Sequence, residues 1–451
     1  MLRSLVALPL LSALVALAQT PAPPLPGTPA GHSLQLWLDA INDPQPARVE
    51  ALVKLDNDET VDGFTGFAHE TGGFKLVSIQ RAAPTRINVM LQEKASGRSV
   101  FGSLSASAGD PPHIESFSLR MLPPGVTVDD PPLDAAERQR VLSGIESALT
   151  KSYVYSETAA KMNAALQAHA QHGDYNNITD GSAFAETLTH DLRDVSHDMH
   201  LHIEYAPFVQ PVRPPEAKPT PEDRARMRQQ LEDINCAFEK VEILPRNIGY
   251  LKFNMFAPPD VCGPTAAAAM AFLAHTKAVI IDVRQNGGGD PAMVQLIVSY
   301  LFDHTEHIND LYYRAKDETT QYWTLPWVPG ERLATQPIFV LTSHRTFSGA
   351  EEFTYDLKNL KRATIVGETT GGGAHPMHGE QIDSHFTIGV PAGRPINPVT
   401  KTDWEGTGVT PDEKTSADDA LPTAIKLAEA KLQADAAQPA NSPAPAAPAA
   451  H

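Results

Sequence analysis

Apolar residues change their spacing along the chain, and each change predicts a different kind of structure. Between residues 33 and 127 they first recur every three to four positions, which is typical of helices, and then alternate with polar residues, which is typical of strands. Turn residues separate the four strand-like runs, which lie near 74–77, 87–91, 99–105 and 117–121. This segment therefore predicts a small α+β domain with helices packed on an antiparallel sheet.

Residues 133–205 keep helical spacing and predict a small bundle of three helices. The third helix runs into SHDMHLH, residues 196–202, which is unusual for its three histidines. A Pro-rich stretch and one charged helical piece follow, so we expect a linker and a helix over residues 206–235.

From residue 236 to about 430, short apolar runs alternate with segments of helical spacing. Runs such as 279–283 and 338–341 predict strands that are buried on both faces, and the alternation is typical of an α/β core with parallel strands. Active sites in such folds collect at the C-terminal ends of the strands. Three glycine-containing loops are expected there, and they are RQNGGGD (284–290), TFSG (346–349) and GETTGGGAHP (367–376).

The N-terminal residues 1–18 look like a secretory signal. Arg3 precedes an almost wholly apolar run, and the small residues Ala16 and Ala18 form a cleavage site before Gln19. The run is too short to span a bilayer comfortably. We therefore expect an exported protein, periplasmic or secreted, without stable membrane insertion; an uncleaved N-terminal anchor is the alternative.

Composition adds three expectations. A Pro-rich linker is expected at 19–32 and a disordered Ala/Pro tail at 436–451. The formal net charge of −18 argues against nucleic acid and anionic membranes as partners. The chain has two cysteines, Cys236 and Cys262, which could form a structural disulfide in an oxidising compartment or remain unpaired.

Ser348 stands where a buried strand is expected to end and a helix to begin. Backbone N–H groups in the first turn of a helix lack helical partners and carry partial positive charge. A serine at this place could attack a carbonyl, and the oxyanion that forms would find donors. Because serine is also a common N-cap, a purely capping role is the alternative.

A serine nucleophile needs a base within hydrogen-bond reach. His200 and, as runner-up, His375 are the candidates, since such sites assemble from segments far apart in sequence. The histidines near residue 200 could instead pack or bind a metal, but further ligands are not evident, so no metal or cofactor is expected. The Gly287–Gly289 loop lacks the Lys-Ser/Thr of a phosphate loop and suits an oxyanion hole, with a tight turn as the alternative.

Four motifs occur in an order that resembles the tail-specific, or C-terminal processing, serine peptidases. They are VIIDVRQNGGG (279–289), TFSGAEEF (346–353), RATIVGETTGGG (362–373) and WEGTGVTPD (404–412). The helical segment ending in SHDMHL resembles the branch that contains the tricorn protease core and the interphotoreceptor retinoid-binding protein modules. This resemblance covers roughly residues 133–425. Residues 33–127 separately resemble cone-shaped domains related to nuclear transport factor and cystatin folds, and a helper or substrate-presenting role is expected for them.

The resemblance implies a spiral α/β core similar to crotonase and Clp protease, with Ser348 as nucleophile. Gly373 stands where the processing branch has its lysine base, so the resemblance points to the histidine-using branch. By motif position, His200 is then the base and Glu405 assists it. Met199 stands where the second serine of the tricorn tetrad would precede the histidine, which is a departure from that branch.

These implications lead to one expected function and one alternative. We expect a serine peptidase that cleaves peptides or unfolded proteins, with the oxyanion held by Gly349 and by Gly288 or Gly289. The alternative is a non-catalytic module of the same fold that binds an apolar ligand, as the retinoid-binding relatives do. An esterase is disfavoured because TFSGA lacks the leading glycine of Gly-x-Ser-x-Gly.

Overall fold

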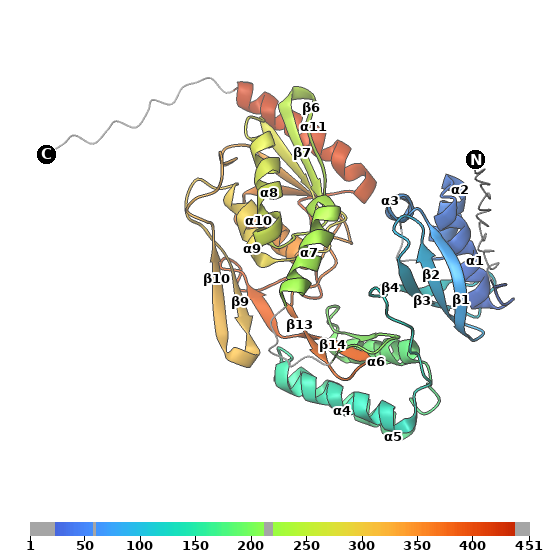
Figure 1. The fold of residues 1–451 in the computed structure, drawn as a ribbon. Helices are drawn as coiled ribbons and strands as arrows, with labels where there is room; N and C mark the ends of the chain where they lie inside the picture. The colour runs from blue at the N-terminus through green and yellow to red at the C-terminus, as the bar shows by residue number, and fades with distance from the viewer. Residues whose placement is uncertain (1–22, 57–59, 212–219, 438–451) are drawn as a thin grey trace, which may run out of the picture. The chain divides into compact units, whose positions relative to one another are not determined.

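The computed structural model describes residues 23–56, 60–211 and 220–437, and the predicted signal at 1–18 lies outside them. The chain forms two compact units (Figure 1). The first unit comprises the chain up to Asp130 together with Ala206–Phe208, and the second comprises Pro131–Tyr205 and the chain from Val209 onward.

The first unit packs three helices on a four-stranded antiparallel sheet of order β1-β2-β3-β4. The elements are α1 (Pro29–Asn42), α2 (Pro46–Val53), α3 (Val61–Thr71), β1 (Phe74–Ala82), β2 (Arg86–Glu93), β3 (Ser99–Ala106) and β4 (Ile114–Met121). The linker predicted for 19–32 was too long, because α1 already begins at Pro29. The Thr28 hydroxyl accepts the N–H of Gly31 and caps this helix, and proline is favoured in its first turn.

The second unit opens with the predicted helices, whose core is shared with strands from much later in the chain. The helices are α4 (Ala135–Ser152), α5 (Ser156–His172) and α6 (Gly181–Ser196). A short strand, β5 (His202–Tyr205), follows and pairs with β14 (Phe386–Pro391), which pairs in turn with β13 (Met377–Gln381). Leu188 of α6 and Phe386 of β14 belong to the same buried cluster, so the helices and this sheet pack as one body.

A six-stranded mixed sheet of order β16-β12-β11-β8-β7-β6 forms the centre of the second unit. The strands are β6 (Phe238–Leu244), β7 (Ile248–Phe253), β8 (Ala278–Asp282), β11 (Ile338–Thr342), β12 (Ala363–Gly367) and β16 (Glu413–Lys414). Only β6 runs antiparallel to its neighbour among these described strands; the others are parallel, as the alternating pattern predicts.

Helices cover both faces of this sheet. Successive residues of a strand point to opposite faces of the sheet. On one face, Ile281 and Val340 pack with three helices, which are α8 (Pro259–Leu273), α9 (Pro291–Ser299) and α10 (Gly349–Asn359). On the other face, Ile280 packs against α11 (Ala417–Ala437). The tail predicted for 436–451 was therefore wrong at its start, because α11 continues to Ala437; the remaining tail residues lie outside the described structure.

Among the remaining elements, α7 (Pro221–Asp233) falls on the predicted charged helix. The others were not predicted from the sequence pattern. They are the antiparallel strands β9 (His307–Tyr313), β10 (Glu318–Trp323) and β15 (Gly393–Ile396), with short 3₁₀ turns at Asn235–Ala237, Pro245–Asn247 and Arg314–Lys316. Cys236 and Cys262 form a disulfide between the turn before β6 and α8.

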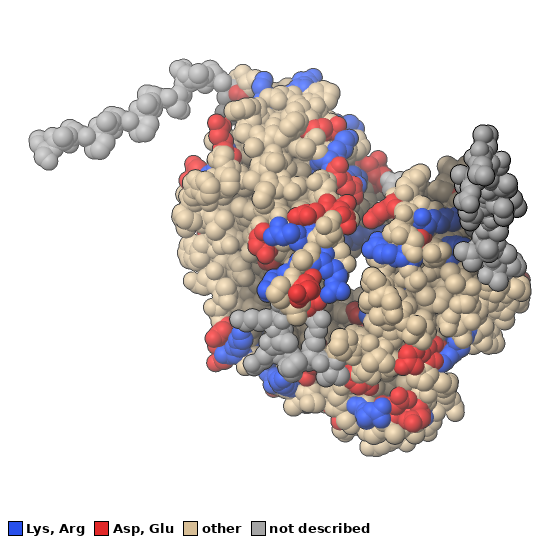
Figure 2. Space-filling model, in the orientation of Figure 1, with Lys and Arg blue, Asp and Glu red and all other residues tan. Residues whose placement is uncertain are grey.

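Two surface properties bear on partners. No helix within the described ranges is long and apolar enough to cross a membrane. Figure 2 shows acidic and basic side chains interspersed on the face in view, instead of one broad basic area of the kind that nucleic acid favours.

Candidate active site

Ser348 lies at the turn between β11 and α10, and its backbone adopts a rare conformation. Its φ of 52° and ψ of −123° are unusual for a residue with a side chain. Such strain persists only where the surroundings enforce it, and it concentrates at functional sites. The neighbouring Gly288 explains part of the constraint, because a Cβ atom there would lie 2.6 Å from the nitrogen of Gly349. The glycine loop is thus pressed directly against the serine turn.

The three predicted oxyanion donors are not equivalent. The N–H of Gly288 donates to the Asn286 side chain at 2.8 Å, so this predicted donor is already occupied. Within the described residues, no acceptor is found for the N–H groups of Gly289 and Gly349. The two glycines are adjacent, since a Cβ atom on Gly349 would lie 3.0 Å from the nitrogen of Gly289. The pair Gly289 and Gly349 is therefore the better fit to an oxyanion hole.

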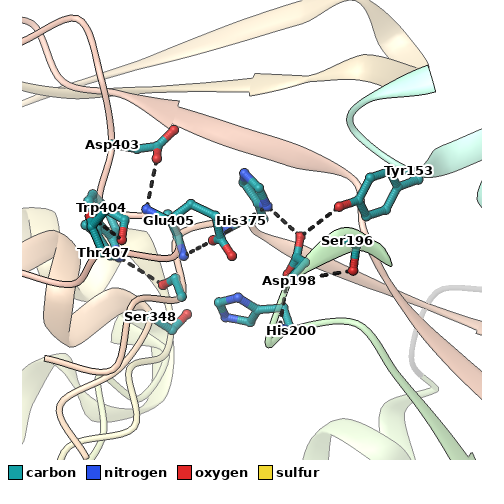
Figure 3. Close-up of polar contacts among 12 residues, drawn as sticks. Tyr153, Ser196, Asp198, His200, Ser348, His375, Asp403, Trp404, Glu405 and Thr407 are labelled. Atoms are coloured by element: carbon teal, nitrogen blue, oxygen red, sulfur yellow. Dashed lines mark hydrogen bonds and ion pairs between the residues drawn. The ribbon is translucent and has the colours of Figure 1, made fainter. Parts of the chain in front are cut away.

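His200 faces Ser348 from the loop between α6 and β5. Figure 3 shows the Ser348 hydroxyl directed toward the imidazole, although no hydrogen bond joins the two side chains in the described structure. The ring of Phe347 lies against the imidazole, with 4.7 Å between ring centroids. Burial lowers the pKa of His200 to about 4, and the nearby charge of Asp198 opposes this only in part. The imidazole is thus neutral at physiological pH, which is the form a base requires.

Glu405 approaches from the loop after Trp404. One carboxylate oxygen, Oε2, accepts the N–H groups of Ala374 at 2.6 Å and His375 at 3.3 Å. The other oxygen, Oε1, is buried without a partner among the described residues, as is Nδ1 of His200. Burial, and secondarily the charge of Asp198, raise the pKa of Glu405 to about 7. Glu405 can therefore change its charge near neutral pH.

Asp198 is a member of the site that the sequence interpretation missed. Its Oδ1 accepts the backbone N–H of His200 at 3.1 Å, and its Oδ2 accepts the ring N–H of His375 at 2.6 Å and the hydroxyl of Tyr153 at 3.3 Å (Figure 3). The carboxylate is 1% exposed. Its position two residues before the candidate base, in the same short loop, was the available signal.

His375, the runner-up base, makes a different set of contacts. Its side chain is 3% exposed, and its Nδ1 is bonded to Asp198. Burial alone would lower the pKa of His375, but the hydrogen bond to Asp198 and the charges of Asp198 and Glu405 outweigh it and raise this pKa. These contacts suit a buried ion pair better than a free base.

Two further observations concern alternatives weighed from the sequence. Asp198, His200 and Glu405 each offer one ligand atom, all within 4.8 Å of one another, so a cation would find three ligands here.

A Cβ atom on Gly373 would overlap the Phe347 ring and lie 2.8 Å from Cε1 of His200. The space that a lysine at this position would need is thus filled by His200 and Phe347.

The chain resembles proteins of one known family. The chain matches the models of Peptidase family S41, at residues 247–415, and of the N-terminal domain of Peptidase S41 in eukaryotic IRBP, at residues 135–245. Among solved structures, it is similar to mature CPAF, with 13% identity and a TM-score of 0.46 over 66% of this chain and 97% of that chain.

Two other structures are similar at the same level. The photosystem II D1 C-terminal processing protease is 13% identical, with a TM-score of 0.39 over 63% of this chain and 94% of that chain. The tricorn protease is 12% identical, with a TM-score of 0.42 over 80% of this chain and 41% of that chain. The two family matches adjoin and together cover α4 to α10, the central sheet and every residue of the candidate site. The chain therefore belongs to peptidase family S41 and is a serine-type peptidase.

Proposed function

We propose that the protein is an exported peptidase that cleaves peptides or unfolded proteins, with Ser348 as nucleophile, His200 as base and the Glu405 carboxylate assisting the base. The observation that carries this proposal is the strained turn at Ser348. The neutral imidazole of His200 lies on one side of this turn, and the adjacent N–H groups of Gly289 and Gly349 lie on the other. Family membership supports peptide substrates. Export rests on the signal-like residues 1–18.

The reaction begins when the Ser348 oxygen attacks the peptide carbonyl and His200 takes the hydroxyl proton. The carbonyl electron pair moves onto oxygen, and the N–H groups of Gly289 and Gly349 stabilise the resulting anion. His200 then gives its proton to the leaving amine as the carbon–nitrogen bond breaks. Water, deprotonated by His200, hydrolyses the acyl-enzyme and restores the serine.

Glu405 and Asp198 act on the imidazolium that forms during this cycle. Both carboxylates lie beside the imidazole, and the charge of each favours its protonated form. Glu405 can contribute only when ionised, so its raised pKa links the reaction to pH. The contacts of His375 with Asp198 favour His200 as the base, because they leave the buried His375 ring committed to a partner.

The finer fold assignments remain part of this proposal. The helix-covered mixed sheet supports a spiral core similar to crotonase and Clp protease, and the helices on the first antiparallel sheet support a cone-shaped accessory domain. We propose that the accessory domain helps to present substrate, and deletion of residues 33–127 tests this through the KM for long substrates.

The proposed site is tested with the mature protein and a mixed peptide library at neutral pH. Wild type is compared with Ser348→Ala and His200→Ala, and a fluorophosphonate probe followed by mass spectrometry identifies the labelled serine. We expect cleavage and labelling of Ser348 in wild type and neither in Ser348→Ala. A Ser348→Ala variant that cleaves as well as wild type would overturn the proposal, and unimpaired cleavage by His200→Ala would move the base to another residue.

A further inference from the structure

Glu351, three residues after the nucleophile, is a buried carboxylate that the mechanism above does not use. It lies in the first turn of α10 and is 0% exposed. No Lys, Arg or His side chain forms an ion pair with it among the described residues. Burying a carboxylate without a cation is costly unless hydrogen bonds compensate for the lost water. The hydrogen bonds that Glu351 accepts therefore show what compensates for its burial.

Four donors converge on this carboxylate. Its Oε2 accepts the N–H of Ser348 at 3.0 Å and the N–H of Gly373 at 2.8 Å. Its Oε1 accepts the N–H of Gly372 at 2.7 Å and the hydroxyl of Thr370. One side chain thus joins the nucleophile turn to the glycine-rich loop that carries His375.

A third segment is attached through the same contacts. The Thr370 hydroxyl, which donates to Glu351, accepts the N–H of Val409 at 2.7 Å. In the same region, the indole N–H of Trp404 donates to the Gly373 carbonyl at 2.9 Å, and the N–H of Gly406 donates to the Gly372 carbonyl at 2.8 Å. The loop that carries Glu405 is therefore held against the loop that Glu351 binds.

These contacts also bear on the oxyanion hole. Because the N–H of Ser348 is committed to Glu351, the donors left at the turn are those of Gly349 and Gly289. The Ser348 backbone has a positive φ, which is unfavourable for a residue with a side chain and must be enforced by its surroundings. The Glu351 carboxyl group accepts the Ser348 N–H and is itself held by three other donors, so it supplies that enforcement.

We infer that Glu351 is a positioning residue that fixes Ser348, the glycine-rich loop and, through Thr370, the Glu405 loop in the geometry needed for attack. This inference rests on the proposed function and deepens it. It assigns to Glu351 no contact with substrate. Its effect is exerted through the placement of the nucleophile and of the groups around it.

The arrangement of donors makes Glu351→Gln a sharp test. Each carboxylate oxygen receives two donors, so either orientation of a glutamine would place its NH₂ group against two donors. Shape and volume are kept, while two of the four hydrogen bonds are replaced by donor-to-donor contacts. Glu352 provides the matched control, because it is the next residue, is also buried, and accepts at Oε1 from Asn309 alone among the described donors.

A second pair of variants keeps the inference testable should Glu351→Gln fold poorly. Thr370→Val removes the hydroxyl that links Glu351 to Val409, whereas Thr370→Ser retains it. If Glu351 and Thr370 serve stability alone, the activity of each variant should fall only as far as its unfolding temperature falls. A positioning role predicts a fall in kcat in variants that remain folded, with KM little changed.

The experiment measures kcat, KM, the rate of Ser348 labelling by a fluorophosphonate and thermal unfolding for wild type and the four variants. We expect Glu351→Gln to lose about 10²-fold in kcat, comparable to the loss of one oxyanion donor, and Thr370→Val to lose about tenfold. Glu352→Gln and Thr370→Ser should stay within about threefold of wild type.

The outcomes separate the two claims. A folded Glu351→Gln variant with wild-type kcat would overturn the inference while cleavage by wild type still supports the proposed function. If Glu351→Gln does not fold, equal kcat in Thr370→Val and Thr370→Ser would overturn it. A wild type that neither cleaves peptides nor labels at Ser348 would overturn the proposed function, and the inference with it.

Discussion

The nucleophile side and the base side of the candidate site depend on the chain in different ways. The nucleophile side is local, because β11, Ser348 and α10 follow one another within residues 338–359. The base side is assembled over long distances, since the hydrogen-bonded Asp198 and His375 are 177 residues apart. The comparison teaches that a strand-to-helix turn can be predicted from pattern, whereas the environment of a histidine depends on which segments fold against it.

The largest expected effect comes from removing the nucleophile or the base. Ser348→Ala and His200→Ala should each lower kcat by about 10⁴-fold or more, because nucleophile and base act as one unit. For the same reason, the kcat of the double variant should be no lower than that of the less active single variant. Steady-state kinetics of the three proteins checks this. Multiplicative losses in the double variant would show that the two sides work independently.

Asp198→Asn tests the base side alone. The substitution removes the charge that holds the His375 ring and stabilises the His200 imidazolium, while leaving Ser348 and α10 untouched. We expect a loss of about 10²-fold in kcat, as for other groups that orient a catalytic histidine. Thermal unfolding serves as the control. Wild-type kcat in Asp198→Asn would show that Glu405 alone suffices.

The pH dependence separates the two acids of the base side. His200, with a pKa lowered to about 4, stays neutral above pH 5, whereas Glu405, with a pKa raised to about 7, gains its charge only as pH rises. We therefore expect kcat/KM to rise about tenfold per pH unit up to about pH 7 and then level off. Glu405→Gln should be less active and lose this rise.

The control for the pH profile lies on the nucleophile side. Burial raises the pKa of Glu351 to about 7 as well, against the opposing effect of its hydrogen bonds. If Glu405→Gln keeps the wild-type profile, then the assignment to Glu405 is wrong and Glu351→Gln becomes the variant to titrate.

Gly373→Ala tests the contact between the two sides. An added methyl group would overlap Phe347, which precedes the nucleophile, and approach the ring of the base. Overpacking of this kind typically costs about 1–3 kcal/mol, so we expect roughly a tenfold loss of kcat. Gly379→Ala is the matched control, because a Cβ atom there meets nothing within 4 Å. Equal activity of the two variants would contradict the proposed contact.

The smallest effect concerns stability. Burial raises the pKa of Glu352 to about 7, so the folded state binds this proton more tightly than the unfolded state. The resulting stabilisation is complete below the unfolded pKa of about 4.5 and disappears as pH rises through about 7. Glu352→Gln, which cannot titrate, should show a smaller fall in unfolding free energy over this range. Denaturant titrations at pH 5 and pH 8 measure it.

Periodicity predicted much of the fold because burial imposes it. The alternation of apolar residues in β2 and the apolar stripe of α6 each reflect one face packed against a core. The fully buried runs of β8 and β11 reflect packing on both faces of the sheet. Exposed strands such as β10 and β13 carry no such stripe, so pattern alone did not reveal them. The end of α11 was missed because alanine and proline outside it share the composition of its last turn.

The residues of the candidate site likewise differ in whether the sequence could predict them. Ser348 followed from its place between a buried run and a helical stripe, and His200 and Glu405 followed from motif resemblance. The contacts of Asp198 depend on His375 and Tyr153, which only tertiary packing brings together. The occupied N–H of Gly288 likewise depends on how the Asn286 side chain turns, which no local pattern encodes.

The pairing of β5 with β14 has a consequence for the order in which the site can form during synthesis. While the ribosome is still translating the region before residue 377, the nascent chain already contains Ser348 and His200 but neither β14, with which β5 pairs, nor Glu405. Pairing across such a sequence distance is a late and slow event in folding. The proposed site is therefore complete only once the chain has been extended past β14 and Glu405.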